Sequence, residues 1–116
     1  MTLQHIALES DWQAARARGS YPVSTLGQLI DDVGFMHCSG SAEQLEGVLR
    51  RFYADVTEPL LLLTLDEASL AEYGLLVRLE PPVPGASVTA QTELFPHLYG
   101  GHLPLGCVRR VDPLVR

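Results

Sequence analysis

The feature that most constrains the fold of this chain is a leucine-rich run in its middle, Leu60 to Leu65. A strand with one face in water alternates apolar and polar residues, whereas a strand covered on both faces is apolar at almost every position. The run therefore predicts a buried strand. Its uninterrupted leucine part, Leu60 to Leu63, is far too short to cross a bilayer, so no membrane association is expected.

Two helices are predicted before this strand. Ser10 and Ser41 each precede a glutamine by three residues, which is the capping-box pattern of a helix start. Gly19 provides a left-handed stop for the first helix, and the second is expected to run to about Tyr53. The second helix has one clean apolar face at helical spacing. That face consists of Leu45, Val48, Leu49 and Phe52.

Short extended segments complete the predicted fold. The other expected strands are Thr2 to Ala7, Phe35 to Cys38, Leu75 to Glu80, Ser87 to Gln91 and Leu105 to Val111. Tyr21 to Asp32 is predicted to be a loop with a turn of helix, and Phe95-Pro96 is expected to break the pattern. Asp66 is expected to cap a single helical turn. Residues 1–116 are thus predicted to form one domain of the α+β class.

Composition excludes several classes of function. The net charge is −6 and all eight basic residues are arginines. Without lysine the protein has no Schiff-base nucleophile and no phosphate-loop lysine. An acidic chain also lacks the positive surface of a general nucleic-acid binder. The two cysteines, Cys38 and Cys107, match no disulfide framework or metal-knuckle spacing, and we interpret them as reduced thiols of a cytoplasmic protein.

The strongest site candidate is the stretch Gly34-Phe35-Met36-His37-Cys38-Ser39. It places polar side chains at the end of a predicted strand, just before a helix start, where sites are commonly built. His37 and Ser39 share one face of the strand, whereas Cys38 points to the other. We therefore interpret His37 and Ser39 as the cluster and Cys38 as a buried small hydrophobe, with a thiol nucleophile as the alternative. His102 follows two glycines and is interpreted as a solvated loop residue.

A second candidate segment runs from Glu93 to Gly100 and holds an acid, an imidazole and a phenol. Glu93, His97 and Tyr99 provide an acid, a donor and a stacking surface for a flat ligand. The alternative is a rigid corner whose aromatic residues fill the core. A further alternative is a three-histidine metal site formed by His5, His37 and His97. No ligand spacing supports that site, so no metal is expected.

The order of these motifs resembles the bacterial domain of unknown function family 952. The resemblance rests on Gly34-Phe35-Met36-His37-Cys38-Ser39 and, most specifically, on Phe95-Pro96-His97-Leu98-Tyr99-Gly100. It covers nearly the whole chain. The chain departs from the family around Glu80 and in the Pro81 to Gly85 loop, so the resemblance gives no role for either. The family implies a fold and no reaction.

A more distant similarity is to the NAD-consuming ADP-ribosyltransferase fold, whose closest branch is the RNA 2′-phosphotransferases. It implies two N-terminal helices packed on a split, mostly antiparallel sheet. His5 matches the histidine of the first strand, His37 the second histidine, and Ser39 the serine that follows. The arginines that grip RNA phosphate in that branch have no counterparts. Arg50 and Arg51 are not expected to replace them, because the other face of their helix packs on the core.

The resemblance implies NAD-linked ADP-ribosyl chemistry on a small molecule or protein. His37 is expected to bond the nicotinamide ribose with Ser39 beside it, and His5 to orient the adenosine or pyrophosphate side. His97 and Tyr99 are expected at the cleft wall, with Glu93 as an acid near the developing charge. The alternatives are nucleotide or ligand binding without turnover and a histidine-based metal protein. His5, His37 and Ser39 are predicted to line one cleft.

Overall fold

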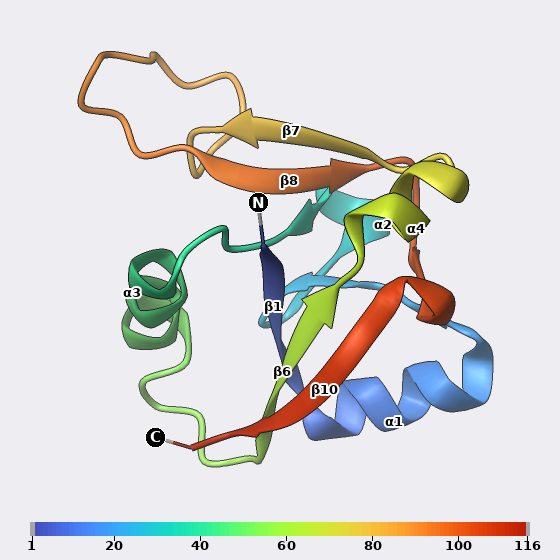
Figure 1. Ribbon diagram of the computed structural model, residues 1–116. Coiled ribbons are helices and arrows are strands. Elements are labelled where there is room, and N and C mark those ends of the chain that lie inside the picture. Colours follow the sequence, from blue (N-terminus) through green and yellow to red (C-terminus); the bar gives the residue numbers. More distant parts are fainter. Residues whose placement is uncertain (1, 116) are drawn as a thin grey trace.

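The strands of the computed structural model, which describes residues 2–115, form two three-stranded antiparallel sheets (Figure 1). The first has the order β1 (Leu3–Leu8), β6 (Leu60–Leu65), β10 (Val108–Leu114). The second has the order β5 (Met36–His37), β8 (Phe95–Tyr99), β7 (Leu76–Glu80). Two short ribbons pair β2 (Ser20–Tyr21) with β9 (Leu103–Pro104) and β3 (Val23–Thr25) with β4 (Gln28–Leu29). The predicted α+β class with a split antiparallel sheet is confirmed.

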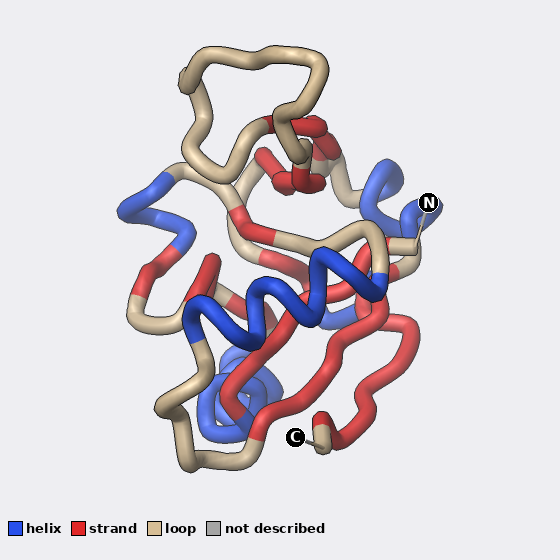
Figure 2. The backbone as a smooth tube through the Cα atoms, turned by 90° about the vertical axis from the view of Figure 1, so that its left-hand side faces the viewer, coloured by secondary structure: helices blue, strands red, loops and turns tan. Residues whose placement is uncertain are grey.

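Four helices and one 3₁₀ turn connect the strands in the described part of the chain. They are α1 (Glu9–Arg18), α2 (Ile30–Val33), α3 (Ala42–Phe52), α4 (Glu67–Glu72) and η1 (Leu105–Cys107). Figure 2 shows α3 from the side, crossing in front of the strands, with the long loop between β7 and β8 standing out at one end of the fold. None of the described helices is long and apolar enough to span a membrane.

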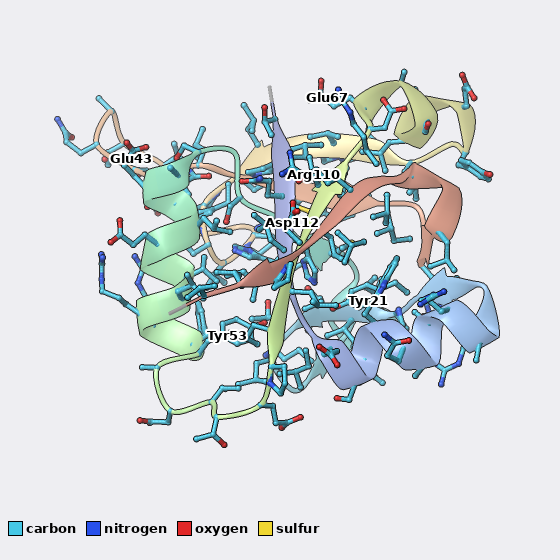
Figure 3. All side chains as sticks on the ribbon, turned by 60° about the horizontal axis from the view of Figure 1, so that its bottom comes forward. Tyr21, Glu43, Tyr53, Glu67, Arg110 and Asp112 are labelled. Carbon is cyan, nitrogen blue, oxygen red and sulfur yellow. The ribbon has the colours of Figure 1, made fainter. Side chains whose placement is uncertain are left out.

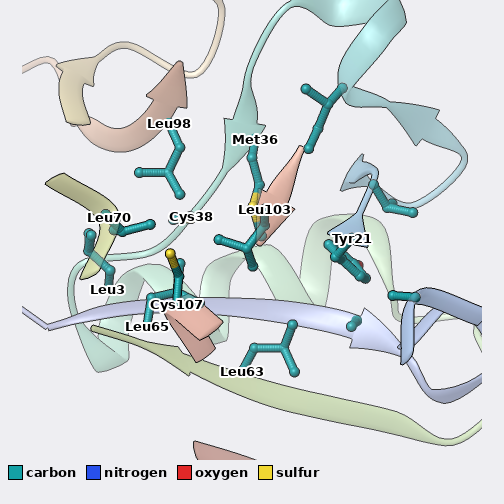
Figure 4. Packing of buried hydrophobic residues seen from close by; sticks show 14 of the residues in the cluster. Leu3, Tyr21, Met36, Cys38, Leu63, Leu65, Leu70, Leu98, Leu103 and Cys107 are labelled. Carbon is teal, nitrogen blue, oxygen red and sulfur yellow. The ribbon is translucent and has the colours of Figure 1, made fainter. Parts of the chain in front are cut away.

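The leucine-rich strand is buried from both faces, as predicted. β6 lies between β1 and β10, and Leu61, Leu63 and Leu65 pack into the larger core. Leu60 points the other way, into a second core beneath α3. Figure 4 shows Leu63 and Leu65 of β6 in the larger core, with Met36 and Leu98 of the second sheet entering it from the opposite side. The larger core therefore joins the two sheets.

β10, an outer strand of the first sheet, carries charged side chains along its edge. β10 pairs only with β6 and carries Arg110 and Asp112, whose side chains form an ion pair with Nε and Oδ2 2.8 Å apart (Figure 3). Charged side chains on an edge strand disfavour pairing with another molecule. The strand begins later than predicted, because Leu105–Cys107 forms the 3₁₀ turn first.

Three of the four predicted helix-end signals are confirmed. Ser41 is the N-cap of α3, and its Oγ accepts a hydrogen bond from the Gln44 amide at 3.2 Å. Asp66 caps α4 in the same way, and Gly19 ends α1 in the left-handed conformation with φ 97°. The prediction for Ser10 was wrong. α1 begins at Glu9, and its N-cap, Leu8, makes no side-chain cap bond.

This difference gives a matched pair of substitutions. Ser41→Ala is expected to lower the free energy of unfolding by about 1 kcal/mol, because one amide of the first turn of α3 loses its acceptor. Ser10→Ala is expected to change it by less than about 0.5 kcal/mol, because Ser10 Oγ makes only an exposed 3.5 Å bond to Glu58. Urea unfolding of both variants measures the two effects. Equal losses would contradict the assignment of the caps.

Other predictions were wrong where short elements depend on distant partners. Tyr21 to Asp32 does contain the predicted turn of helix, α2, but the segment before it pairs as β3 and β4 and is not a loop. Ser87 to Gln91 lies in the connection between β7 and β8 and forms no strand. Phe52 was predicted on the buried face of α3 but is 48% exposed. The other three residues of that face, Leu45, Val48 and Leu49, do pack in the second core.

The most consequential error concerns Phe95-Pro96, which does not break the pattern but begins β8, the central strand of the second sheet. The Pro96 carbonyl accepts a hydrogen bond from the Cys38 amide at 3.0 Å, just beyond the end of β5. In an antiparallel pair the N–H and C=O of a residue point to the same side. The N–H that proline lacks is therefore on the β5 side, and pairing with β7 continues.

Candidate functional site

One face of the second sheet carries its polar and aromatic residues. His37 of β5 lies directly opposite His97 of β8, and Met36 lies opposite Leu98. Because neighbours in a strand alternate, the two histidines point to one face and the Met36–Leu98 pair to the other. Phe95 and Tyr99 share the histidine face of β8. β7 brings Glu80 to the same face, since Glu80 is registered opposite Phe95.

A network of hydrogen bonds runs across this face, and we call it the Glu80–His97–His37 network. Glu80 Oε1 lies 3.0 Å from His97 Nδ1, and His97 Nε2 lies 3.2 Å from His37 Nδ1. Tyr99 Oη donates to the same oxygen of Glu80. His97 is completely buried and Phe35 stacks on its ring, with centroids 4.2 Å apart. The last polar atom, His37 Nε2, is buried and has no hydrogen-bond partner among residues 2–115.

The charges in the network follow from burial. Burial lowers the pKa of His97, although the Glu80 carboxylate acts in the opposite direction. Burial, reinforced by His97, His5 and Arg51, lowers the pKa of His37 to about 3. Desolvation alone would raise the pKa of Glu80, but hydrogen bonds from Tyr99 and His97 lower it. The site therefore contains an ionised carboxylate and two neutral imidazoles at neutral pH.

His5 is held by two hydrogen bonds to protein groups. Its Nδ1 lies 2.7 Å from the His37 carbonyl oxygen, and its Nε2 lies 2.9 Å from Tyr21 Oη. A carbonyl can only accept, so Nδ1 carries the hydrogen and Nε2 accepts from the tyrosine. Burial lowers the pKa of His5 to about 4. His5 thus fixes the backbone at His37, and both of its ring nitrogens are occupied.

Two spaces adjoin His37. A void of about 10 Å³, close to the size of one water molecule, is lined by His5, His37, Cys38 and Ser39 among others. A larger pocket of about 240 Å³ opens beside the same histidine, and we call it the His37 pocket. Its walls are mostly aromatic and apolar. They are formed by Thr25, Gln28, Phe35, His37, Val48, Arg51, Phe52, Pro82, Val83 and Phe95.

The structure brings most of the predicted site residues together, around two spaces rather than one cleft. His5, His37 and Ser39 converge on the small void, and Ser39 lines no part of the His37 pocket. His97 and Tyr99 belong to the Glu80–His97–His37 network behind the pocket.

Three other candidates lie away from the pocket. Glu93 is exposed and does not line it. Cys38 is buried in the larger core, where burial raises the pKa of its thiol. His102 bonds Asp31 at 2.8 Å in an exposed position.

Arg51 was expected to lie away from the site but lines the His37 pocket. It lies three residues beyond Val48 on α3, and both residues line the pocket. Arg51 forms no ion pair with any described residue, unlike Arg50, which pairs with Glu46 on the exposed side. It therefore adds a positive charge, unpaired among the described residues, to a pocket whose other walls are mostly apolar.

Sequence reasoning missed Glu80 and Tyr21 as partners of the histidines. The alternation Phe95-x-His97-x-Tyr99 was available as a signal, since it places three rings on one face of a strand. Pro96 obscures this signal, because proline is rare in central strands. The position of Glu80 beside His97 could not be predicted from the sequence, because it depends on the register of β7 on β8. Within residues 2–115, no group of three His, Cys, Asp or Glu side chains is arranged to hold a metal ion, so the three-histidine alternative finds no support.

The fold and the site define an α+β protein with a split antiparallel sheet and a histidine-lined pocket. The chain belongs to the family described as "Protein of unknown function (DUF952)", whose model matches residues 6–111. This confirms the resemblance found in its motifs.

The chain is also similar to protein CC0527 from Caulobacter crescentus. The crystal structure of CC0527 matches with a TM-score of 0.73 at 24% identity, over 99% of this chain and 87% of CC0527. The solution NMR structure of CC0527 matches with a TM-score of 0.67 at 25% identity, over 97% and 84%. These similarities support the fold. The comparison with curated proteins found no match.

Proposed function

We propose that the protein binds a small ligand in the His37 pocket and that the ligand donates a hydrogen bond to His37 Nε2. The observation that carries the proposal is this buried nitrogen, which has no partner in the described part of the chain. Nearly all buried polar groups in folded proteins are hydrogen-bonded to protein or to ordered water, so an unpaired one on a residue that lines a pocket calls for a partner from outside the chain. A hydroxyl or N–H group of a ligand provides that partner.

The walls of the pocket support a ligand with a flat ring and a negative charge. Phe35 and Phe95 offer aromatic surface, and Arg51 offers a guanidinium that no described carboxylate pairs. At about 240 Å³ the pocket is slightly smaller than ordinary small-molecule sites, which begin near 300 Å³. It therefore suits one end of a dinucleotide better than a whole one. Phe52 and Val83 are exposed at its edge, and rotation of their side chains would widen the approach to His37.

These features favour a nucleotide of the NAD class, held by its nicotinamide-ribose end. A ribose hydroxyl would donate to His37 Nε2, the ring would lie against Phe35 or Phe95, and the phosphates would face Arg51. Ser39 and His5 would support His37 from behind instead of touching the ligand. In its stronger form the proposal includes transfer of ADP-ribose to a small-molecule or protein acceptor, as the ADP-ribosyltransferase resemblance implies.

Binding without turnover is the alternative, and one observation favours it. The pKa of His37 is lowered to about 3, so its imidazole accepts hydrogen bonds well but is a weak base near neutral pH. General bases work best when their pKa lies near the working pH. His37 is therefore better suited to hold a hydroxyl in place than to remove its proton.

Calorimetric titration of NAD tests the proposal. We expect wild type and His102→Ala to bind NAD, and His37→Ala to bind at least tenfold more weakly, because the hydrogen bond to the ribose is lost. His102 is the matched control because it lies away from the pocket. NAD at about 100 times its dissociation constant should also add about 2.7 kcal/mol to the free energy of unfolding. No heat at millimolar NAD in the wild type would overturn the NAD assignment, and equal binding by His37→Ala would remove His37 from the site.

A further inference from the structure

We infer that Glu80, acting through His97, determines whether His37 accepts or donates a hydrogen bond in the His37 pocket. It does so by fixing the tautomer in which His37 Nε2 is an acceptor. Neither Glu80 nor His97 lines the pocket. They are positioning residues that act on a ligand only through the tautomer of His37. The selectivity that follows deepens the proposed function and rests on it, whereas the tautomer itself is a property of the free protein.

The first step is the bond between Glu80 and His97. An ionised carboxylate can only accept hydrogen bonds. Glu80 Oε1 faces both Tyr99 Oη and His97 Nδ1, so each of these groups must donate to it. The hydrogen of His97 is thereby placed on Nδ1. Hydrogen bonds to charged groups contribute about 1.5–3 kcal/mol, so this tautomer is favoured at least about tenfold.

In the second step, the tautomer of His97 determines the tautomer of His37. His97 is completely buried, and a neutral imidazole with its hydrogen on Nδ1 has only a lone pair on Nε2. His37 Nδ1 lies 3.2 Å from His97 Nε2 and must donate a hydrogen bond to that lone pair. The hydrogen of His37 is then on Nδ1, and its Nε2 is left with a lone pair. The alternative is a doubly protonated His97, which would donate to His37 instead and turn its Nε2 into an N–H group.

The tautomer of His37 determines which ligand groups the pocket can bind. A pocket atom that only accepts favours a ligand with a hydroxyl or N–H at that position and rejects an isostere with an ether or carbonyl oxygen, since two lone pairs would then face each other. Leaving a buried polar group unpaired costs about 1–3 kcal/mol, which corresponds to roughly 5- to 150-fold in affinity. Removal of Glu80 should weaken this discrimination without changing any side chain of the pocket wall.

Nitrogen NMR of histidine-labelled protein tests the tautomer, because protonated and unprotonated ring nitrogens resonate far apart. In the wild type at pH 7 we expect more than about nine-tenths of His37 to carry its hydrogen on Nδ1. In Glu80→Leu we expect that fraction to fall to a half or less, since nothing then fixes the hydrogen of His97 on Nδ1. Tyr99→Phe is the matched control. It removes the other donor to Glu80 and should leave the His37 tautomer unchanged.

The wild-type spectrum is decisive even if Glu80→Leu fails to fold. A hydrogen on His37 Nε2 in the wild type, or an unchanged tautomer in folded Glu80→Leu, would overturn the inference. A second arm compares NAD with an analogue whose nicotinamide-ribose hydroxyls are methylated. The wild type should prefer NAD at least fivefold, and Glu80→Leu less than twofold. Absence of NAD binding would count against the proposed function and leave the tautomer result standing.

Discussion

Lowering the pH from 7 to 4 is expected to remove several kcal/mol of stability. The pKa is lowered to about 4 for His5 and to about 3 for His37, against 6.5 in the unfolded chain. Between pH 6.5 and 4 the unfolded state therefore binds more protons than the folded state, and stability falls as the pH falls. Each of the two histidines contributes about 2 kcal/mol to the loss by pH 5 and about 3 kcal/mol by pH 4.

Other groups modify this profile. His97, whose pKa is also lowered, acts in the same direction in the same window. Glu80 acts in the same direction below pH 4.5, because its lowered pKa makes the folded state hold fewer protons there. Asp11 opposes them, because burial and then the nearby Glu58 raise its pKa. A domain of ordinary stability, 5–15 kcal/mol, would lose much of it near pH 4.

Urea unfolding at pH 7, 6, 5 and 4 measures the effect. The matched variant is His5→Gln, whose amide can still donate and accept but does not titrate. Its free energy of unfolding should depend less on pH, with a slope smaller by up to about 1.4 kcal/mol per pH unit below pH 6. A flat stability between pH 6.5 and 5 in the wild type would contradict the buried neutral histidines.

The fold was largely predictable because its strongest signals are local. The leucine run predicted β6, the serine cap and apolar spacing predicted α3, and Gly19 predicted the end of α1. These signals depend on residues a few positions apart, so one sequence contains them in full. The strands between Tyr21 and Leu29 were missed for the opposite reason. They are two or three residues long and exist only through pairing with each other or with β9.

The candidate site was predictable only in part for a related reason. His37 was found from its place at a strand end, but its main partners come from β8 and β7, 43 to 60 residues further along the chain. Their meeting depends on the register of three strands, which no local pattern specifies. A shift of one residue would send every side chain of a strand to the other face. Such a shift of β8 would place Leu98 opposite His37 in place of His97 and abolish the network.

His97→Leu is expected to lower the free energy of unfolding by about 3–5 kcal/mol. Leucine fills a similar volume, so the cavity contribution should be small. The loss comes from two hydrogen bonds: Glu80 loses a donor to its carboxylate, worth about 1.5–3 kcal/mol, and His37 Nδ1–H is left buried without an acceptor, at about 1–3 kcal/mol. His102→Leu breaks an exposed bond to Asp31 and should cost less than about 1 kcal/mol.

A double-mutant cycle separates this network from simple packing. His37→Leu also breaks the bond to His97, so the variant with both substitutions loses that bond only once and leaves no unpaired imidazole hydrogen on either side. Its destabilisation should therefore be smaller than the sum of the two single effects by about 1 kcal/mol or more. Exact additivity in urea unfolding at pH 7 would show that the two rings do not depend on each other. The tautomer of His37 is set through the same bond. That result would therefore also contradict the inferred effect of Glu80 on His37.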